Sequence, residues 1–241
     1  MLSIIIPTYN EIKNKMIQTS FPKLYELSKS SKDLEVLIID SFSTDGTLEL
    51  AKKYNFTISQ IQTNSRGIRL NHGIEMALGE MIILHHPRSI LSEKGITYLI
   101  NNPQLKWGAF KHQFDRQHPL LKFTSFYSNY IRGRRGIFYL DHCIFSQKIL
   151  LEKAGLVPEI EIFEDTELCL RLLKHSPGAL LPYTSITSAI RFDKNGLIKQ
   201  SLLNQAAKLK YYMNFNHQKI NKIYEKNVNL NSTHNENESG K

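Results

Sequence analysis

A carboxylate at the end of a predicted strand is the residue of this chain whose position says most about chemistry. Asp40 comes directly after the apolar residues 36–39, which are typical of a buried strand. In an open α/β sheet, ligands bind just beyond the carboxyl ends of the strands, where loops lead into helix N-termini with unpaired N–H groups. Residues 43–46 supply Ser, Thr and Asp oxygens that can cap a helix beginning near Thr47. Asp40 therefore either faces a ligand crevice or belongs to an ordinary capped turn.

Two further carboxylates, Glu164 and Asp165, stand side by side at the start of another predicted helix. A carboxylate positioned at a helix start can act as a general base that removes the proton of a hydroxyl nucleophile. Acids are also common in the first turn of any helix, because they interact favourably with the macrodipole. Glu167 and Arg171 have the spacing of an (i, i+4) ion pair. Taken alone, the segment favours this structural interpretation.

The composition limits the kind of protein. The chain has 241 residues, enough for one large core, and a net charge of +9, which favours nucleotides, phosphates, anionic lipid or nucleic acid as partners. Cys143 and Cys169 are too few for a disulfide framework or a zinc cluster, so we expect free thiols and a reducing compartment. Pro7 interrupts the apolar N-terminal run, which argues against a signal peptide, and no apolar stretch is long enough to span a bilayer. We expect a soluble, cytoplasmic protein, with peripheral contact at the inner face of the membrane left open.

The elements that must position these residues alternate between strand and helix through the first hundred residues, which predicts βαβ units and a mainly parallel sheet. The predicted strands are residues 2–6, 34–39, 56–61 and 81–84, and the helices are residues 11–30, 47–54 and 67–78. After Leu91 the pattern is less regular. There we expect strands at 107–114 and 137–145, an aromatic and basic helical region at 120–132, and helices near 147–154, 165–175 and 197–213.

The expected organisation is one domain over residues 1–226, divided into halves at 1–91 and 92–226. Residues 227–241 are dominated by Asn, Ser, Glu and Thr, and we expect them to form a disordered polar tail. The fold class expected is α/β, with a central, mainly parallel, Rossmann-like sheet flanked by helices.

Several segments, in order and with matching spacing, resemble the successive motifs of family 2 glycosyltransferases. They are residues 3–11 (SIIIPTYNE), 38–47 (IIDSFSTDGT), 69–73 (RLNHG) with 77–80 (ALGE), 140–145 (LDHCIF) and 163–171 (FEDTELCLR). Residues 187–191 (TSAIR) resemble a stretch found in a small subgroup of single-domain bacterial transferases. Each motif alone is weak, whereas their common order is a specific signal. The likeness covers residues 1 to about 215.

The resemblance implies a GT-A fold, a nucleotide-diphospho-sugar donor bound by residues 1–91, and direct displacement with inversion at the anomeric carbon. Asp40 can accept a hydrogen bond from a base N–H or a ribose hydroxyl, whereas Thr8 and Tyr9 offer a hydroxyl and a stacking face. Glu11 fits the first turn of a helix equally well. The donor-binding candidates are Pro7, Thr8, Tyr9, Glu11, Asp40, Arg66, Arg69 and Arg88.

On the acceptor side, the resemblance makes Asp165 the expected catalytic base, with Glu164 beside it. A hydroxyl is a poor nucleophile until a positioned base removes its proton as the new bond forms. Asp141 and His142 are the acceptor-side candidates. Asp141 could orient the acceptor or the base, or it could be a loop acid bonded to a nearby backbone N–H.

The chain departs from the family after the fourth predicted strand. Family members usually carry an Asp-x-Asp motif there, whose acids hold Mg²⁺ or Mn²⁺ against the donor diphosphate, whereas this chain has His85, His86, Pro87 and Arg88. In the related subgroup a His occupies the position of His85 and the acid stands where Pro87 is. Adjacent side chains of an extended segment point to opposite faces, so the two imidazoles do not form a chelate. His86 is the one candidate metal ligand.

Three consequences of this departure stay open. A divalent cation, Mg²⁺ or Mn²⁺, can bind through fewer protein ligands, since Mg²⁺ often keeps water and phosphate ligands. Alternatively, Arg66, Arg69 and Arg88 can bind the phosphates in place of the metal. The third alternative is a degenerate nucleotide-sugar-binding or regulatory protein without transfer activity. We prefer atypical metal dependence to loss of catalysis, and rank a basic nucleic-acid-binding protein below both.

Residues 122–136 mix aromatic side chains with three arginines. Such a segment can bind a phosphorylated or lipid-linked acceptor, lie against an anionic membrane, or bind single-stranded nucleic acid. It also fits an amphipathic helix packed by its aromatics, which is the interpretation we favour for those side chains. For Arg132, Arg134 and Arg135, anion contact and simple solvation stay open as alternatives.

Overall fold

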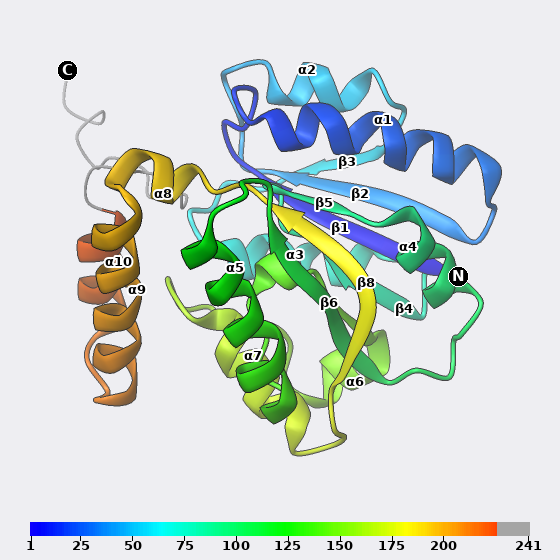
Figure 1. The fold of residues 1–241 in the computed structure, drawn as a ribbon. Helices are drawn as coiled ribbons and strands as arrows, with labels where there is room; N and C mark the ends of the chain where they lie inside the picture. The colour runs from blue at the N-terminus through cyan, green and yellow to red at the C-terminus, as the bar shows by residue number, and fades with distance from the viewer. Residues whose placement is uncertain (226–241) are drawn as a thin grey trace.

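The structure is a computed structural model that describes residues 1–225, so the tail predicted for residues 227–241 lies outside the described part. Its eight strands are β1 (Leu2–Thr8), β2 (Leu34–Asp40), β3 (Thr57–Gln60), β4 (Met81–Leu84), β5 (Ser89–Leu91), β6 (Trp107–Phe114), β7 (Ile144–Gln147) and β8 (Ala179–Thr187). They form one sheet with the order β3-β2-β1-β4-β7-β6-β8-β5. Strands from both the early and the late part of the chain therefore belong to one sheet (Figure 1).

The first four strands are parallel, as predicted from their alternation with helices. β1 lies between β2 and β4, and all seven of its residues are buried. Its near-continuous apolar run is what a strand covered on both faces requires. Pro7 is tolerated because pairing with β4 ends at Ile5, so no N–H is needed from Pro7 on that side. The carboxyl ends of these strands consequently meet at one edge of the sheet.

The second half of the sheet is mixed. β7 is antiparallel to β4 and to β6, β8 runs parallel to β6, and β5 closes the far edge antiparallel to β8. β4, β6 and β8 therefore point the same way, and their carboxyl ends also share an edge. The strand predicted for residues 137–145 is wrong for most of its length. Residues Leu140–His142 form a short 3₁₀ turn, and the strand begins only at Ile144.

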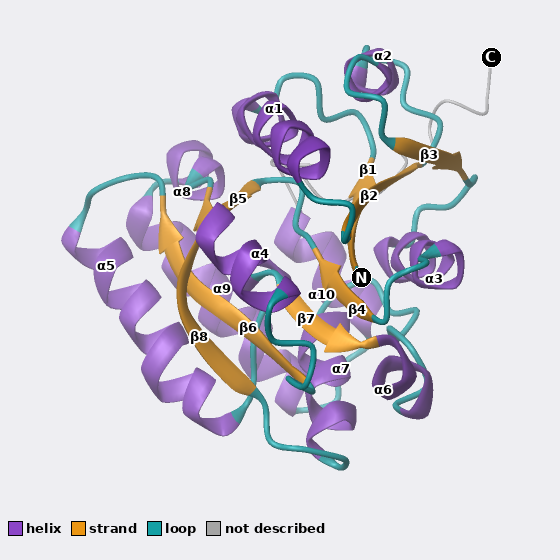
Figure 2. Cartoon of the chain, turned by 90° about the vertical axis from the view of Figure 1, so that its right-hand side faces the viewer, coloured by secondary structure: helices purple, strands orange, loops and turns teal. Residues whose placement is uncertain are grey.

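Helices cover both faces of the sheet (Figure 2). One face carries α1 (Lys15–Ser30), α2 (Thr47–Lys52) and α4 (Glu93–Ile100), which contribute Phe21, Ala51 and Ile96 to one core. The other carries α3 (Arg66–Met76), α6 (Lys148–Lys153) and α7 (Glu164–Leu173), which contribute residues such as Leu70 and Leu168 to a second core. Cys143 and Cys169 are buried and free.

A third group of helices lies beside the sheet edge. It comprises α5 (Pro119–Phe126), which continues as a π-helical turn (Tyr127–Arg132) and a 3₁₀ turn (Gly133–Arg135), together with α8 (Ile190–Asn195), α9 (Leu197–Tyr212) and α10 (His217–Glu225). In Figure 1 α9 and α10 stand side by side at the margin of the molecule, and they are in contact. Within residues 1–225, no helix combines the length and apolar character needed to cross a bilayer.

Gly108 lies in β6 between β7 and β8, at a position with no room for a side chain. A Cβ atom there would overlap the carbonyl oxygen of Ala179 and lie 2.8 Å from the ring of Phe145. Replacing Gly108 with Ala should therefore lower the free energy of unfolding by about 2 kcal/mol, as overpacking of a tight core does, measured by urea denaturation. At Gly133 the nearest atom to a new Cβ is 3.4 Å away, so Gly133→Ala is the matched control. Equal midpoints for the two variants would contradict this account of the sheet.

Candidate functional site

A cavity of about 460 Å³ opens at the edge where β4, β6 and β8 end. Its walls come from the segment after β4, the N-terminal ends of α3 and α7, the 3₁₀ turn before β7, and α5 and α8 to α10. Helix N-termini and parallel strand ends both favour anionic ligands, because unpaired N–H groups point outward there. The cavity therefore lies at the carboxyl ends of parallel strands, but beside β4, β6 and β8 and not at the end of β2, where Asp40 stands.

Asp165 lines this cavity from the first turn of α7 and is 8% exposed. Its Oδ2 accepts a hydrogen bond from the backbone N–H of Leu140 at 2.8 Å, and its Oδ1 accepts from the N–H of Thr166 at 2.6 Å. These bonds fix the carboxylate, and Oδ2 retains a free lone pair. Burial raises the pKa of Asp165, which makes the carboxylate a stronger base than an exposed one.

Glu164 lies behind Asp165 and does not line the cavity. It is 2% exposed and accepts a hydrogen bond from Arg66 Nε at 2.5 Å. Burial raises the pKa of Glu164, and the Arg66 charge opposes that rise. Because Arg66 stands at the start of α3 and lines the cavity, this pair ties two walls together and holds the guanidinium in place.

Arg88 is the second guanidinium in the cavity wall, and it pairs with Glu11 at 2.7 Å. Asn14 donates to both the Glu11 carboxylate (3.1 Å) and the carbonyl of Pro87 (3.0 Å), which fixes the loop after β4 against β1. The first-turn interpretation of Glu11 is wrong, because α1 begins at Lys15 and has no acid in its first turn. The side chain of Arg88 is only 13% exposed.

Asp40 is fully buried and lies outside the cavity lining. Its carboxylate accepts from Thr8 Oγ1 (2.8 Å), from Ser43 N (2.8 Å) and Oγ (2.5 Å), and from Gln60 Nε2 at 3.4 Å. The capped turn is thus part of what Asp40 does, since it holds the loop after β2 to the end of β1. A contact between Asp40 and a donor nucleotide stays a prediction.

Five more sequence candidates also lie outside the cavity wall. Arg69 is buried and donates to the carbonyl of Thr63 at 3.2 Å, and burial together with the Arg66 charge lowers its pKa to about 10. Glu11 acts on the wall through Arg88. The remaining donor candidates, at the end of β1, are Pro7, Thr8 and Tyr9.

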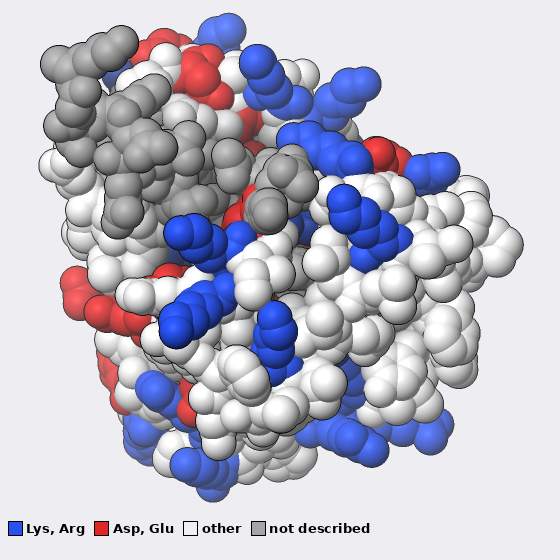
Figure 3. All heavy atoms as spheres, turned by 90° about the vertical axis from the view of Figure 1, so that its left-hand side faces the viewer, with Lys and Arg blue, Asp and Glu red and all other residues white. Residues whose placement is uncertain are grey.

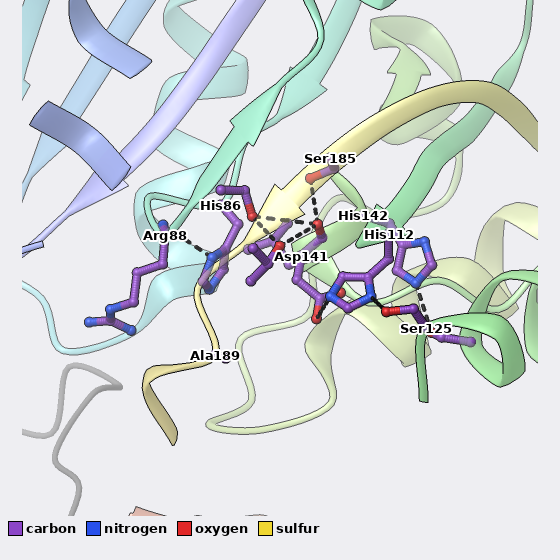
Figure 4. Close-up of polar contacts among 12 residues, drawn as sticks. His86, Arg88, His112, Ser125, Asp141, His142, Ser185 and Ala189 are labelled. Atoms are coloured by element: carbon purple, nitrogen blue, oxygen red, sulfur yellow. Dashed lines mark hydrogen bonds and ion pairs between the residues drawn. The ribbon is translucent and has the colours of Figure 1, made fainter. Parts of the chain in front are cut away.

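Asp141 lies in the cavity wall, where Figure 4 shows it close to His142 and His112. Its backbone carbonyl accepts from the hydroxyls of Ser185 (2.6 Å) and Thr187 (3.1 Å), which fixes the turn against β8. Its Oδ2 lies 3.5 Å from His112 Nε2, and its Oδ1 is buried with no hydrogen-bond partner in the described part of the chain. Burial raises the pKa of this carboxyl.

His142 does not reach the cavity. It is fully buried, with Nδ1 bonded to the carbonyl of Phe110 (3.0 Å) and Nε2 to the hydroxyl of Ser128 (2.8 Å). Burial lowers its pKa to about 4, so the ring is neutral and holds the turn to β6. His142 is therefore a structural residue, and His112 is the histidine that lines the cavity. A lone His in the predicted strand 107–114 carried no signal for this.

The residues after β4 do not fit a site for Mg²⁺ or Mn²⁺, which take mainly oxygen ligands. His85 is 1% exposed, whereas His86 lines the cavity and its Nδ1 accepts the N–H of Arg88 at 3.2 Å. Burial lowers the pKa of His86 well below its usual value, and the charges of Arg66 and Arg88 lower it further. Within residues 1–225, no group of three or more His, Cys, Asp or Glu side chains could hold a metal ion. A cation at His86 would face two guanidinium groups.

The known proteins that this chain resembles in sequence are glycosyltransferases. Residues 3–87 match the family model described as "Glycosyl transferase family 2". The poly(ribitol-phosphate) beta-N-acetylglucosaminyltransferase TarS of Staphylococcus aureus is 34% identical over 93 residues, which are 34% of this chain and 15% of TarS. A "Dolichyl N-acetyl-alpha-D-glucosaminyl phosphate 3-beta-D-2,3-diacetamido-2,3-dideoxy-beta-D-glucuronosyltransferase" of Methanococcus voltae is 27% identical over 242 residues, covering 86% of this chain and 72% of that protein. This chain therefore spans only a small part of TarS.

Solved structures show the same fold. The crystal structure of S. aureus TarS 1-349 in complex with UDP-GlcNAc has a TM-score of 0.62 and 20% identity, covering 95% of this chain and 71% of that chain. The mannosyltransferase PcManGT of Pyrobaculum calidifontis, in complex with GDP-Man and Mn²⁺, has a TM-score of 0.60 and 16% identity, covering 92% and 67%. The GT-A-like α/β fold predicted from the motifs is confirmed.

Proposed function

Because residues 3–87 match the model of glycosyl transferase family 2, we propose that the chain transfers a sugar from a nucleotide-diphospho-sugar donor to a hydroxyl group of an acceptor. The observation that carries this proposal is the convergence of one buried carboxylate, Asp165, and two fixed guanidinium groups, those of Arg66 and Arg88, on a single cavity. Sugar transfer needs both kinds of group, a base for the acceptor and positive charge for the departing diphosphate.

In the proposed reaction, the acceptor oxygen attacks the anomeric carbon of the donor sugar. The bond from that carbon to the diphosphate oxygen breaks, the nucleoside diphosphate leaves with the electron pair, and the configuration at the carbon inverts. The acceptor proton passes to Oδ2 of Asp165, the oxygen that accepts one hydrogen bond from the described residues, that of Leu140 N–H. The raised pKa of this buried carboxyl suits a base that must take the proton near neutral pH.

Arg66 and Arg88 are proposed to neutralise the charge that develops on the diphosphate. A guanidinium can bind phosphate oxygens through two parallel hydrogen bonds, and it keeps its charge throughout the reaction. Each is already held by a buried carboxylate, so little reorganisation is needed when the charge appears. The structure of PcManGT contains Mn²⁺. In this chain the side chains after β4 suit a metal poorly, so we propose that arginines bind the diphosphate instead.

The donor class is supported by what the relatives bind. The TarS structure holds UDP-GlcNAc and the PcManGT structure holds GDP-Man. We extend from them only the class of donor, because a few loop side chains set the base and the sugar on a shared fold. Asp40, Thr8 and Tyr9 remain the proposed contacts for the nucleoside.

A screen of nucleotide sugars by thermal shift tests this proposal. We expect one nucleotide sugar, together with its nucleoside diphosphate, to raise the midpoint of thermal unfolding, because a ligand of the native state stabilises it by mass action. The rival, a basic nucleic-acid-binding protein, predicts salt-sensitive binding of oligonucleotides that nucleoside diphosphates do not displace. Oligonucleotide binding without any nucleotide-sugar binding would overturn the proposal.

A further inference from the structure

Two cations in the cavity wall have no carboxylate partner. Arg132 and Lys208 line the cavity, and neither forms an ion pair with any acid in residues 1–225. The other cationic side chains of this wall are paired. Arg66 and Arg88 have Glu164 and Glu11 as their partners, and Arg191 pairs with Glu225 at 2.5 Å.

The two cations meet at one aromatic ring. The guanidinium carbon of Arg132 lies 3.7 Å from the centre of the Tyr139 ring, and Lys208 Nζ lies 5.7 Å from the same point. Both Arg132 Nη1 and the Tyr139 hydroxyl are buried without a hydrogen-bond partner among residues 1–225, and Tyr139 also lines the cavity. Unsatisfied buried donors are rare in native proteins, so several of them beside one cavity indicate a ligand that accepts hydrogen bonds there.

The local backbone conformation determines that Arg132 faces the cavity. Arg132 ends the π-helical turn Tyr127–Arg132, an arrangement that is rare and often associated with functional sites. Arg134 and Arg135, only two and three residues later, are exposed and lie outside the cavity lining. The structure thus separates Arg132 from its two neighbours, which the sequence alone could not do.

The unpartnered cations lie on the acceptor side of the proposed base. Arg132 and Lys208 interact electrostatically with Asp141, and Arg132 also with Asp165. His86, beside Arg88, interacts with Arg66 and Arg191 instead. Asp165 interacts with both Arg66 and Arg132, so cations of both groups act on it. One group is assigned to the donor diphosphate, which leaves the other for the acceptor.

We propose that Arg132, Lys208 and the Tyr139 hydroxyl form a subsite for a phosphate group carried by the acceptor, an inference that rests on the proposed function. A phosphate monoester offers three acceptor oxygens and close to two negative charges at neutral pH, which match two cations and a hydroxyl donor. Figure 3 shows many Lys and Arg side chains on one face of the molecule, with fewer Asp and Glu side chains among them.

The wall beside this subsite is apolar, which leaves two sources for the phosphate. Phe123 is 63% exposed and Tyr127 41% exposed, and both line the cavity, so the packed interpretation of the aromatics is wrong for these two. A soluble phosphorylated acceptor would use the cations alone, whereas a lipid-linked one would also cover these rings. The same phosphate chemistry underlies both, so the experiment has an arm for each source.

The test measures binding of glycerol 3-phosphate to the full chain, with UDP and GDP present to occupy the donor site. Arg132→Gln and Lys208→Gln should each weaken binding about tenfold, the effect of losing one hydrogen bond to a charged group, and glycerol should not bind. Arg134→Gln and Lys199→Gln are the matched controls, since both residues are exposed and outside the cavity. Equal affinities in all five proteins, or no binding to any of them, would overturn the subsite.

A second arm uses vesicles of phosphatidylcholine with and without phosphatidic acid, whose headgroup is a phosphate monoester. Binding that needs phosphatidic acid and Arg132 supports the subsite with a lipid as the source, and vesicle binding unaffected by Arg132→Gln counts against it. Nucleotide binding is measured in the same proteins. Loss of nucleotide binding with Arg132-dependent phosphate binding intact would contradict the proposed donor while supporting the subsite.

The pH dependence gives an independent readout. Burial and the charge of Arg132 lower the pKa of Lys208 to about 8, and Asp141 is the acid that opposes this. The affinity for glycerol 3-phosphate should therefore fall about tenfold from pH 7 to pH 9 as Lys208 loses its proton. Lys208→Arg should abolish that fall, because guanidinium stays charged. A fall that persists in Lys208→Arg would contradict the assignment of Lys208.

Discussion

We expect Asp165→Asn to lower the rate of sugar transfer by about 10²- to 10⁴-fold, the usual contribution of a general base, while the affinity for the donor stays unchanged. The amide cannot take a proton from the acceptor hydroxyl. It keeps the size of the carboxylate and one oxygen that can accept from the N–H of Leu140. The measurement is the steady-state rate of nucleoside diphosphate release together with donor affinity by calorimetry.

Glu167→Gln is the matched control for this prediction. Glu167 lies in the first turn of the same helix, is half-buried, pairs with Arg171 at 3.7 Å and accepts a hydrogen bond from the Tyr211 hydroxyl at 3.2 Å. It does not line the cavity, so its replacement should leave the rate unchanged. Unchanged turnover in Asp165→Asn would remove Asp165 from the role of base, and Asp141, with its buried unpartnered Oδ1, would be the next candidate.

Replacing Arg88 with Gln should weaken binding of the nucleoside diphosphate by about tenfold or more, while binding of the nucleoside alone stays the same. Charge-assisted hydrogen bonds to phosphate contribute about 1.5–3 kcal/mol each, and every 1.4 kcal/mol is a factor of ten. Calorimetry in EDTA isolates the arginine contribution, because no divalent cation is then available to the diphosphate.

Glu11→Gln tests how the negative charge beside the Arg88 guanidinium affects phosphate binding. This change removes the negative charge next to Arg88 but keeps a hydrogen-bonding group of the same size at 2.7 Å. Diphosphate affinity should hold or rise, because Arg88 no longer shares its charge with a buried acid. Equal losses for diphosphate and nucleoside in Arg88→Gln would show that Arg88 shapes the loop without contacting phosphate.

The parallel half of the fold was predictable because local pattern and tertiary structure agree there. Residues 2–6, 34–39 and 81–84 are mostly apolar and are buried, apart from the half-buried Glu35. The start of α1 was placed too early, at residue 11 instead of Lys15. Residues 11–13 are held as a turn by long-range bonds, such as that from the N–H of Glu11 to Thr47 Oγ1, which no local pattern records.

The second half was predicted less well for the same physical reason. β8 was missed because Pro182 lies within it, and the strand accommodates that residue by a shift in register opposite Phe110 and Lys111. The strand expected at 137–145 is instead largely a turn, which is held by the carbonyl of Phe110, bonded to the ring of His142, and by the carboxylate of Asp165. Short elements fixed by distant partners leave little trace in sequence periodicity.

The residues of the site were likewise predicted only in part. The motif at Glu164 and Asp165 pointed to the cavity, and Arg66 and Arg88 reach it as well. Which arginine of residues 132–135 would face inward depended on a π-helical turn that the sequence does not announce. Lys208 was missed because a lysine on a predicted helix is normally solvated, and only the packing of α9 beside the cavity distinguishes it.

Release of nucleoside diphosphate is the measurement that tests the central claim most directly. The full chain is incubated with the nucleotide sugar that the thermal-shift screen selects, with phosphorylated and unphosphorylated acceptors, in EDTA and in Mn²⁺. We expect nucleoside diphosphate to appear together with a glycosylated acceptor of inverted configuration, and to be retained in EDTA. Tight binding of the donor with no release under any of these conditions would contradict the account and leave a nucleotide-sugar-binding protein without transferase activity.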